Sequence, residues 1–291
     1  MSIPTLTSLL PLFSSEPACI RFLTDAGVFY PSRPCPTCHT DMTLYSDLNA
    51  FVCPKKNCRK KLSLKSGSFF AGHKLPTSKI LFLAYLWLAK VPNSASIIMS
   101  GHSNKSVANF YVYFRQLVAS HLDEEDTKIG GPGVIIEIDE SKFGKRKYHR
   151  GHHVEGVWIV GGVERTEERK AFAVPVQNRT NETLLAVLAE HVLPGSIVLT
   201  DGWAGYREVT RILGLEHRTV NHSENFVDPV TGTHTNTIEG TWNGIKQNIA
   251  PRNRTESNVS GHLFEFMWRR KHAATLWDSL VTAMKEVSFD E

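Results

Sequence analysis

The sequence predicts an α/β main domain preceded by a helical segment, a metal-stapled module and a second helical region. Three observations predict this order. Four of the five cysteines lie between residues 35 and 58, in a stretch rich in Pro, Lys and Ser. Residues 76–122 carry apolar side chains at helical spacing, and from Val134 onward short apolar runs alternate with helical patterns. The 291 residues, 41% of them hydrophobic, are enough to bury a core.

We expect five segments along the chain. Two short helices, Leu6–Phe13 and Pro17–Ala26, are expected in the first segment. An acidic and then glycine-rich composition is typical of a linker. The expected segments are an N-terminal helical segment at 1–30, a zinc ribbon at 31–75, a helix-turn-helix-like region at 76–122, the linker at 123–133 and the α/β domain at 134–291.

The cysteine spacing predicts one structural zinc ion. Cys35-Pro-Thr-Cys38 and Cys53-Pro-Lys-Lys-Asn-Cys58 read as two knuckles joined by a hairpin. Four thiolates complete a tetrahedral zinc site and leave no open position, so its role would be structural. The second knuckle has a longer spacing than usual, and unligated cysteines in a reducing compartment are the alternative. Cys19 stands apart and is expected to be a small buried hydrophobe.

A helix-turn-helix is the candidate DNA-reading element. Ser94–Met99 reads as a short helix that Gly101 ends, and Ser103 is a good N-cap for the next helix. Lys105 and Asn109 lie near the start of that second helix, where a recognition helix meets the major groove. An ordinary packing hairpin explains the same pattern equally well.

The basic residues fall into three clusters although the net charge is only +4. Separate clusters suit a protein that touches a phosphate backbone at several places, while solvated surface is the alternative. The residues expected to bind DNA are Lys55, Lys56, Arg59, Lys60 and Lys61 in the ribbon, Lys105 and Asn109 in the helical region, and Lys142, Lys145, Arg146, Lys147 and Arg150 in the main domain; the third cluster comprises Arg252, Arg254 and residues 269–272. No apolar run reaches the length of a membrane span, and the N-terminus lacks the basic start of a secretory signal.

Three acids stand where a divalent-metal site would need them. The apolar strands expected at 134–139 and 197–201 end in Asp139 and Asp201. Glu239 lies on the polar stripe of an amphipathic helix whose other stripe contains Trp242. Three such carboxylates can hold two Mg²⁺ ions, because hard oxygen ligands suit that ion. Taken singly, each Asp is more simply a cap or turn residue.

Five longer strings resemble the Merlin superfamily of DNA transposons, whose bacterial insertion-sequence relatives of the ISXO2-like group share the same catalytic domain. The resemblance spans about residues 131–272, and the cysteine ribbon upstream also resembles the family. The strings are EIDESKFGKRK at 137–147, RGHHVEGVW at 150–158, VNHSENFVDP at 220–229, THTNTIEGTW at 233–242 and FEFMWRR at 264–270.

This resemblance implies an α/β, ribonuclease H-like (retroviral integrase-like) catalytic domain and cut-and-paste DNA transposition. The implied DDE triad falls on Asp139, Asp201 and Glu239, with two Mg²⁺ or Mn²⁺ ions. Some bacterial relatives use Asn as the third ligand, and Asn236, one turn before Glu239, is that alternative. The implied partners are the terminal inverted repeats and the target DNA, bound by a homodimer, in the nucleus or, for a bacterial source, the cytoplasm.

Two other functions remain open from the sequence. One is a transposase-derived DNA-binding protein that has lost catalysis, and the other is a ribonuclease H-like nuclease acting on RNA–DNA hybrids or junctions. Retention of all three acids favours an active enzyme over the first, and the upstream modules favour recognition of DNA ends over the second.

Trp203 and Tyr206 are expected in the core, with stacking on a flipped base as the alternative.

Overall fold

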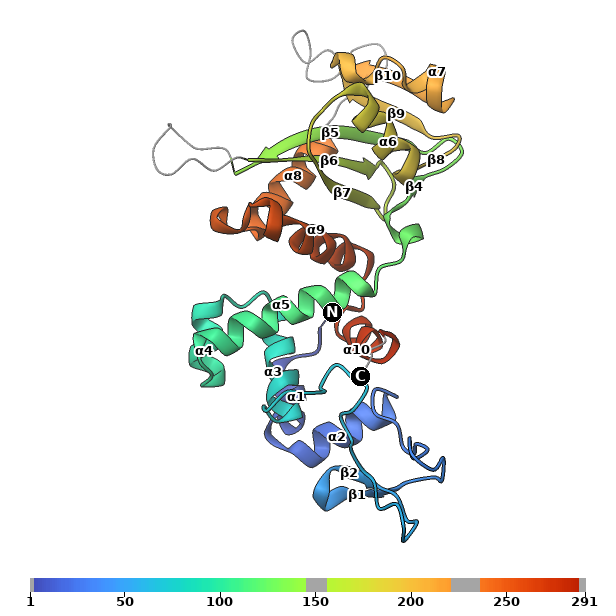
Figure 1. Cartoon of the computed structure of the whole chain (residues 1–291). Coiled ribbons are helices and arrows are strands. Elements are labelled where there is room, and N and C mark those ends of the chain that lie inside the picture. The colour runs from blue at the N-terminus through green and yellow to red at the C-terminus, as the bar shows by residue number, and fades with distance from the viewer. Residues whose placement is uncertain (1–2, 145–155, 221–235, 288–291) are drawn as a thin grey trace. The chain divides into compact units, whose positions relative to one another are not determined.

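The chain divides into two compact units, Met1–His121 with His272–Glu291, and Leu122–Lys271. The computed structural model describes residues 3–144, 156–220 and 236–287. Figure 1 shows the elements of both units, and each unit is described by itself below. In the described part of the chain, no helix has the length and apolar character needed to cross a membrane.

The first unit is built on helices that surround α3. Ten of the twelve residues of α3 are buried, because this helix is apolar on nearly every side. Glu16 accepts hydrogen bonds from the backbone N–H groups of Thr77 and Ser78, both at 2.8 Å, and so caps the start of α3. The helices are α1 (Leu6–Ser14), α2 (Glu16–Asp25), α3 (Thr77–Leu88), α4 (Asn93–Ser100), α5 (Asn104–Ser120) and α10 (Leu276–Glu286).

Helix α10 belongs to this first unit, although we expected the main domain to extend to residue 291. The Trp277 ring packs against Phe13, Phe22 and Tyr85 from the N-terminal helices. The apolar stripe of α10 indicates that the helix is buried, but a stripe carries no information about which core it joins.

The first unit also holds the small sheet of the cysteine module. Its strands are antiparallel in the order β1-β2-β3, with Leu44 opposite Phe51 and Phe51 opposite Leu62. Phe51 and Val52 are the buried residues of the central strand. The elements are β1 (Thr43–Tyr45), η1 (Ser46–Leu48), β2 (Ala50–Val52) and β3 (Lys61–Ser63).

The second unit is a mixed five-stranded sheet in the order β10-β9-β5-β6-β7. Strands β5, β6 and β7 are antiparallel neighbours, whereas β9 is parallel to β5 and β10 is parallel to β9. The strands are β5 (Ile135–Phe143), β6 (Val157–Glu164), β7 (Ala171–Val176), β9 (Ile197–Asp201) and β10 (Glu216–Val220).

Helices cover both faces of this sheet (Figure 1). One face, with Ile138, Val160 and Phe172, packs against Leu184 and Leu188 of α6. The other face packs against α8 and α9 through one shared apolar cluster. The remaining elements are η2 (Glu124–Thr127), β4 (Ile129–Gly130), α6 (Asn181–His191), β8 (Val192–Leu193), η3 (Ala204–Tyr206), α7 (Val209–Leu213), α8 (Asn236–Asn248), η4 (Pro251–Asn253) and α9 (Glu256–Lys271).

The segment expected as a linker is part of this unit. Residues 123–133 contain η2 and β4, and Ile129 pairs in parallel with Val192 of β8. Ile129 is fully buried in the α6-side core. The glycine-rich composition of this segment therefore belongs to turns at the start of the domain and not to a linker between domains.

Candidate active site and metal centre

The Asp139 carboxylate on β5 is hydrogen-bonded to the indole of Trp242 on α8. The Asp139 side chain lies on the α8 side of β5, where Trp242 Nε1 donates a hydrogen bond to Asp139 Oδ2 at 2.9 Å. Gly161 is the residue paired with Asp139 on β6. A Cβ at Gly161 would lie 2.6 Å from the Trp242 ring, so the glycine makes room for the indole that orients Asp139.

Asp201 reaches the same edge of the sheet from the neighbouring strand. In the parallel pair of β5 and β9, Glu137 lies opposite Leu199, so Asp139 and Asp201 each follow two residues later along their strands. The Asp201 carboxylate accepts the backbone N–H of Trp203 at 3.0 Å, which closes the turn after β9.

Glu239 projects from the first turn of α8 and is exposed. The start of α8 is fixed by Glu137, a fully buried carboxylate two residues before Asp139. Glu137 Oε2 accepts the backbone N–H of Ile238 at 2.8 Å, and Glu137 Oε1 accepts Arg165 Nε at 2.6 Å. One buried residue on β5 therefore positions the helix that carries Glu239.

Asp201 and Glu239 are close enough to Asp139 for their charges to affect the pKa of its carboxyl group. Burial raises the pKa of Asp139, hydrogen bonds from Trp242 and from the Glu140 backbone lower it, and the charges of Asp201 and Glu239 raise it again. Burial also raises the pKa of Glu140, which lies on the opposite face of β5. A buried carboxylate with further carboxylates nearby, such as Asp139, fits a site for cations.

Asn236 begins α8 and is exposed, one turn before Glu239. The sequence singled out Asp139, Asp201 and Glu239; in the structure Asp201 is on the strand next to that of Asp139, and Glu239 is on the helix that is hydrogen-bonded to β5. The sequence reasoning missed Glu137 and the donor role of Trp242. The apolar spacing of Trp242 indicated a buried helix face, but nothing local indicated that its N–H would meet a carboxylate.

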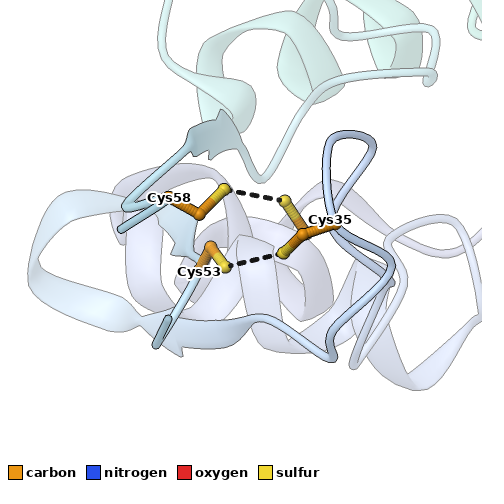
Figure 2. A group of neighbouring side chains, drawn as sticks. Cys35, Cys53 and Cys58 are labelled. Carbon is orange, nitrogen blue, oxygen red and sulfur yellow. Dashed lines mark hydrogen bonds between the residues drawn. The ribbon is translucent and has the colours of Figure 1, made fainter. Parts of the chain in front are cut away.

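The four cysteines form a compact sulfur cluster (Figure 2). The Sγ atoms of Cys35 and Cys58 are 3.6 Å apart, those of Cys38 and Cys53 are 3.4 Å apart, and all four lie within 4.8 Å of one another. Tetrahedral zinc with Zn–S bonds of about 2.3 Å places its sulfurs about 3.8 Å apart. Hydrogen bonding with the side chain and backbone of Thr40 lowers the pKa of the Cys38 thiol to about 6. This donor set fits a structural zinc ion.

Both knuckles have the same backbone closure despite their different lengths. The N–H of Cys35 donates to the carbonyl of Thr40, and the N–H of Cys53 donates to the carbonyl of Lys60, both at 2.9 Å. His39 and Arg59, the residues after each second cysteine, share left-handed backbones with φ of 55° and 46°. The two additional residues of the second knuckle are therefore accommodated inside its loop.

The basic residues of the ribbon lie beside the sulfur cluster and are exposed. Three of them, Lys55, Lys56 and Lys60, line an open pocket together with Cys38 and Cys58. The exposed basic residues of the ribbon are Lys55, Lys56, Arg59, Lys60 and Lys61.

The helical pair has the expected layout. Gly101, with φ of 70°, ends α4, and the Ser103 side chain accepts the N–H of Ser106 at 3.2 Å at the start of α5. Lys105 and Asn109 are exposed on α5.

In the second unit, Lys142 is exposed on β5. The predicted residues Lys145, Arg146, Lys147 and Arg150 lie outside the described residues.

Comparison with known proteins identifies the second unit. The model of the ISXO2-like transposase domain matches residues 122–270, which coincide with this unit and make up just over half of the chain. A protein of Haemophilus influenzae described as an uncharacterized transposase-like protein is 32% identical over 101 residues, which cover 34% of this chain and 80% of that relative. The chain belongs to the family of transposases that carry the ISXO2-like domain.

Proposed function

We propose that the protein is an active DNA transposase of the DDE type, with Asp139, Asp201 and Glu239 as its catalytic acids. The observation that carries this proposal is the placement of the three carboxylates on adjoining elements: β9 is the parallel neighbour of β5, and α8 is hydrogen-bonded to β5 through Glu137 and Trp242. Asp201 and Glu239 are near enough to act electrostatically on Asp139. Family membership supports the same reaction class, DNA cleavage.

A ribonuclease H-like fold is part of the proposal. A mixed sheet with helices on both faces supports it, because two neighbouring parallel strands bring two acids to one sheet edge and a helix adds the third.

The three carboxylates would hold two Mg²⁺ or Mn²⁺ ions. When bound, such ions activate the attacking hydroxyl and stabilise the leaving oxygen in phosphoryl transfer. The residues' own contributions follow from their contacts. Trp242 keeps the Asp139 carboxylate in one orientation, and Glu137 keeps Glu239 at a fixed distance from the sheet by fixing the start of α8.

The proposal assigns DNA binding to the remaining modules. The exposed lysines and arginine of the ribbon, and Lys105 and Asn109 of α5, would recognise the terminal inverted repeats. Lys142, with the predicted residues Lys145, Arg146, Lys147 and Arg150 that follow it, would hold DNA near the cleavage site. Since cut-and-paste transposition joins two ends, the active species would be a homodimer on DNA.

The decisive experiment incubates the full-length protein with DNA that carries the ends of its own element. Mg²⁺-dependent cleavage followed by strand transfer is expected for the natural protein. Asp139→Asn, Asp201→Asn and Glu239→Gln should each abolish cleavage while the protein still binds the ends, because each removes one charge at nearly constant volume. Glu168→Gln is the matched control, since Glu168 is exposed outside the site.

The outcomes separate the candidate functions. Full activity in all three acid variants would overturn the proposal. Binding without cleavage by the natural protein would support the catalytically retired DNA-binding protein. Normal cleavage by Glu239→Gln together with an inactive Asn236→Ala would move the third ligand to Asn236.

A further inference from the structure

We propose that Trp203, Arg179, Trp158 and Lys142 form a binding surface for an unstacked DNA base and its phosphate, and that this surface includes the turn that follows Asp201. We call these four residues the cation–aromatic surface. The inference rests on the proposed function, because it assigns to the same site a place for the strand that is cut. It goes further by naming the chemical form of the substrate, a nucleotide that is not stacked in a duplex.

Arg179 joins the two indoles of this surface. Its guanidinium carbon lies 3.8 Å from the centre of the Trp158 ring and 5.0 Å from that of the Trp203 ring. Both separations are within the range of cation–π attraction. The same side chain is 3.8 Å from Glu140 on β5, which fixes its position from a second side. The two rings are therefore held next to each other by one cation.

Trp203 is more exposed than a tryptophan that packs in the core. Tryptophan is usually buried, yet Trp203 is 45% exposed, whereas Tyr206 three residues later is 1% exposed. Its backbone N–H is tied to Asp201, and a Cβ at Gly205 would lie 2.8 Å from Trp203 Nε1. The indole thus rests on a glycine and keeps much of its surface accessible, two residues after a proposed catalytic acid.

The surface also carries an exposed positive charge. Lys142 and Trp158 are paired across β5 and β6, and Lys142 Nζ lies 5.4 Å from the centre of the Trp158 ring. Lysine and arginine attract phosphates, while an indole offers its face to a base. A base inside a duplex has both faces covered by its neighbours, so the ligand of an indole face is an unpaired or flipped nucleotide.

The test compares overhangs that differ only in their bases. Full-length, zinc-loaded protein without added magnesium is titrated into two fluorescent duplexes, one with a short 3′ overhang of thymidines and one with an abasic overhang of equal length. Stacking of one base on an aromatic ring predicts a thymidine preference of at least about fivefold for the natural protein. Trp203→Ala should remove the preference, and Trp203→Phe should restore most of it.

Tyr30→Ala is the matched control. Tyr30 is also an exposed aromatic residue beside an arginine, Arg33, but it belongs to the first unit. It should leave the preference unchanged. An unchanged preference in Trp203→Ala, or equal binding of both overhangs by the natural protein, would overturn the inference. Because no cleavage is needed, a protein that prefers the thymidine overhang but never cuts DNA would contradict only the proposed function.

Discussion

Trp242 donates its indole N–H to Asp139 at 2.9 Å, over a glycine on the neighbouring strand. Trp242 lies three residues after Glu239 on the same helix. Helix α8 thus supplies one proposed metal ligand and orients another. A change on this helix therefore affects two acids at once, and the contact between Trp242 and Asp139 can be tested without removing either acid.

Trp242→Phe should shift the pH dependence of cleavage upward. Phenylalanine keeps a ring above Gly161 but removes the donor that stabilises the Asp139 carboxylate, so the pKa of Asp139 rises further. Cations bind the ionised carboxylate, and the acid limb of the pH–rate profile should therefore move to higher pH. Loss of such a supporting contact typically costs about 10–100-fold in metal affinity or activity. Trp268→Phe, at a buried indole of α9, should leave the acid limb in place.

Gly161→Ala should impair folding and cleavage together. The new methyl group would lie 2.6 Å from the Trp242 ring and 3.2 Å from the backbone oxygen of Phe172, so the indole must move away from Asp139. Overpacking of this kind costs roughly 1–3 kcal/mol in urea denaturation. Gly261→Ala on α9 meets no atom within 4 Å and should stabilise the protein by about 0.5–1 kcal/mol. Equal stability of the two variants would contradict the proposed packing.

The sequence predicted the elements of the site better than the contacts between them. An apolar run that ends in Asp201-Gly202 is enough to indicate a buried strand and its edge. The run on β5 has three carboxylates, of which Glu137 and Asp139 are on one face of the strand and Glu140 is on the other. The partners of Glu137, Ile238 and Arg165, and the partner of Asp139, Trp242, are far away in the sequence. No local pattern therefore ranks the three acids.

Exposure was predictable only where the hydrophobic pattern decides it. Tyr206 lies in the core as expected. Trp203, also expected in the core, is exposed because the turn after β9 places it on Gly205. The domain predicted for α10 differs from the observed unit for a related reason. Trp277 indicates a buried helix face, but the sequence does not indicate which aromatic residues bury it.

Removal of zinc should unfold the cysteine module alone. The strands of the small sheet β1-β2-β3 have only three residues each, so metal binding supplies folding free energy to the module. After chelation, hydrogen exchange should increase across the module while β5 and β9 keep their protection.

Metal analysis should give one zinc per chain. Cys53→Ser should lose it, and Cys19→Ser, at a buried cysteine outside the cluster, should keep it. Less than half an equivalent in the natural protein would count against the site.

Glu137→Gln should separate the positioning of α8 from general stability. Arg165 Nε and the N–H of Ile238 donate to different oxygens of Glu137, and glutamine replaces one of those oxygens by an NH2 group that cannot accept, so one of the two bonds is lost. An unsatisfied buried donor costs roughly 1–3 kcal/mol, which denaturation will show. With the start of α8 loosened, Glu239 is held less firmly, and the magnesium concentration for half-maximal cleavage should rise.

Glu164→Gln provides the matched comparison for that variant. Glu164 is also a buried acid of the same unit, and it accepts the N–H of Gly130 at 2.7 Å and the hydroxyl of Thr166 at 2.9 Å. Neither partner belongs to α8, so Glu164→Gln should lose a similar amount of stability with an unchanged magnesium requirement. If both variants needed more magnesium to the same extent, the effect of Glu137 would be one of stability only, and its role in positioning Glu239 would be wrong.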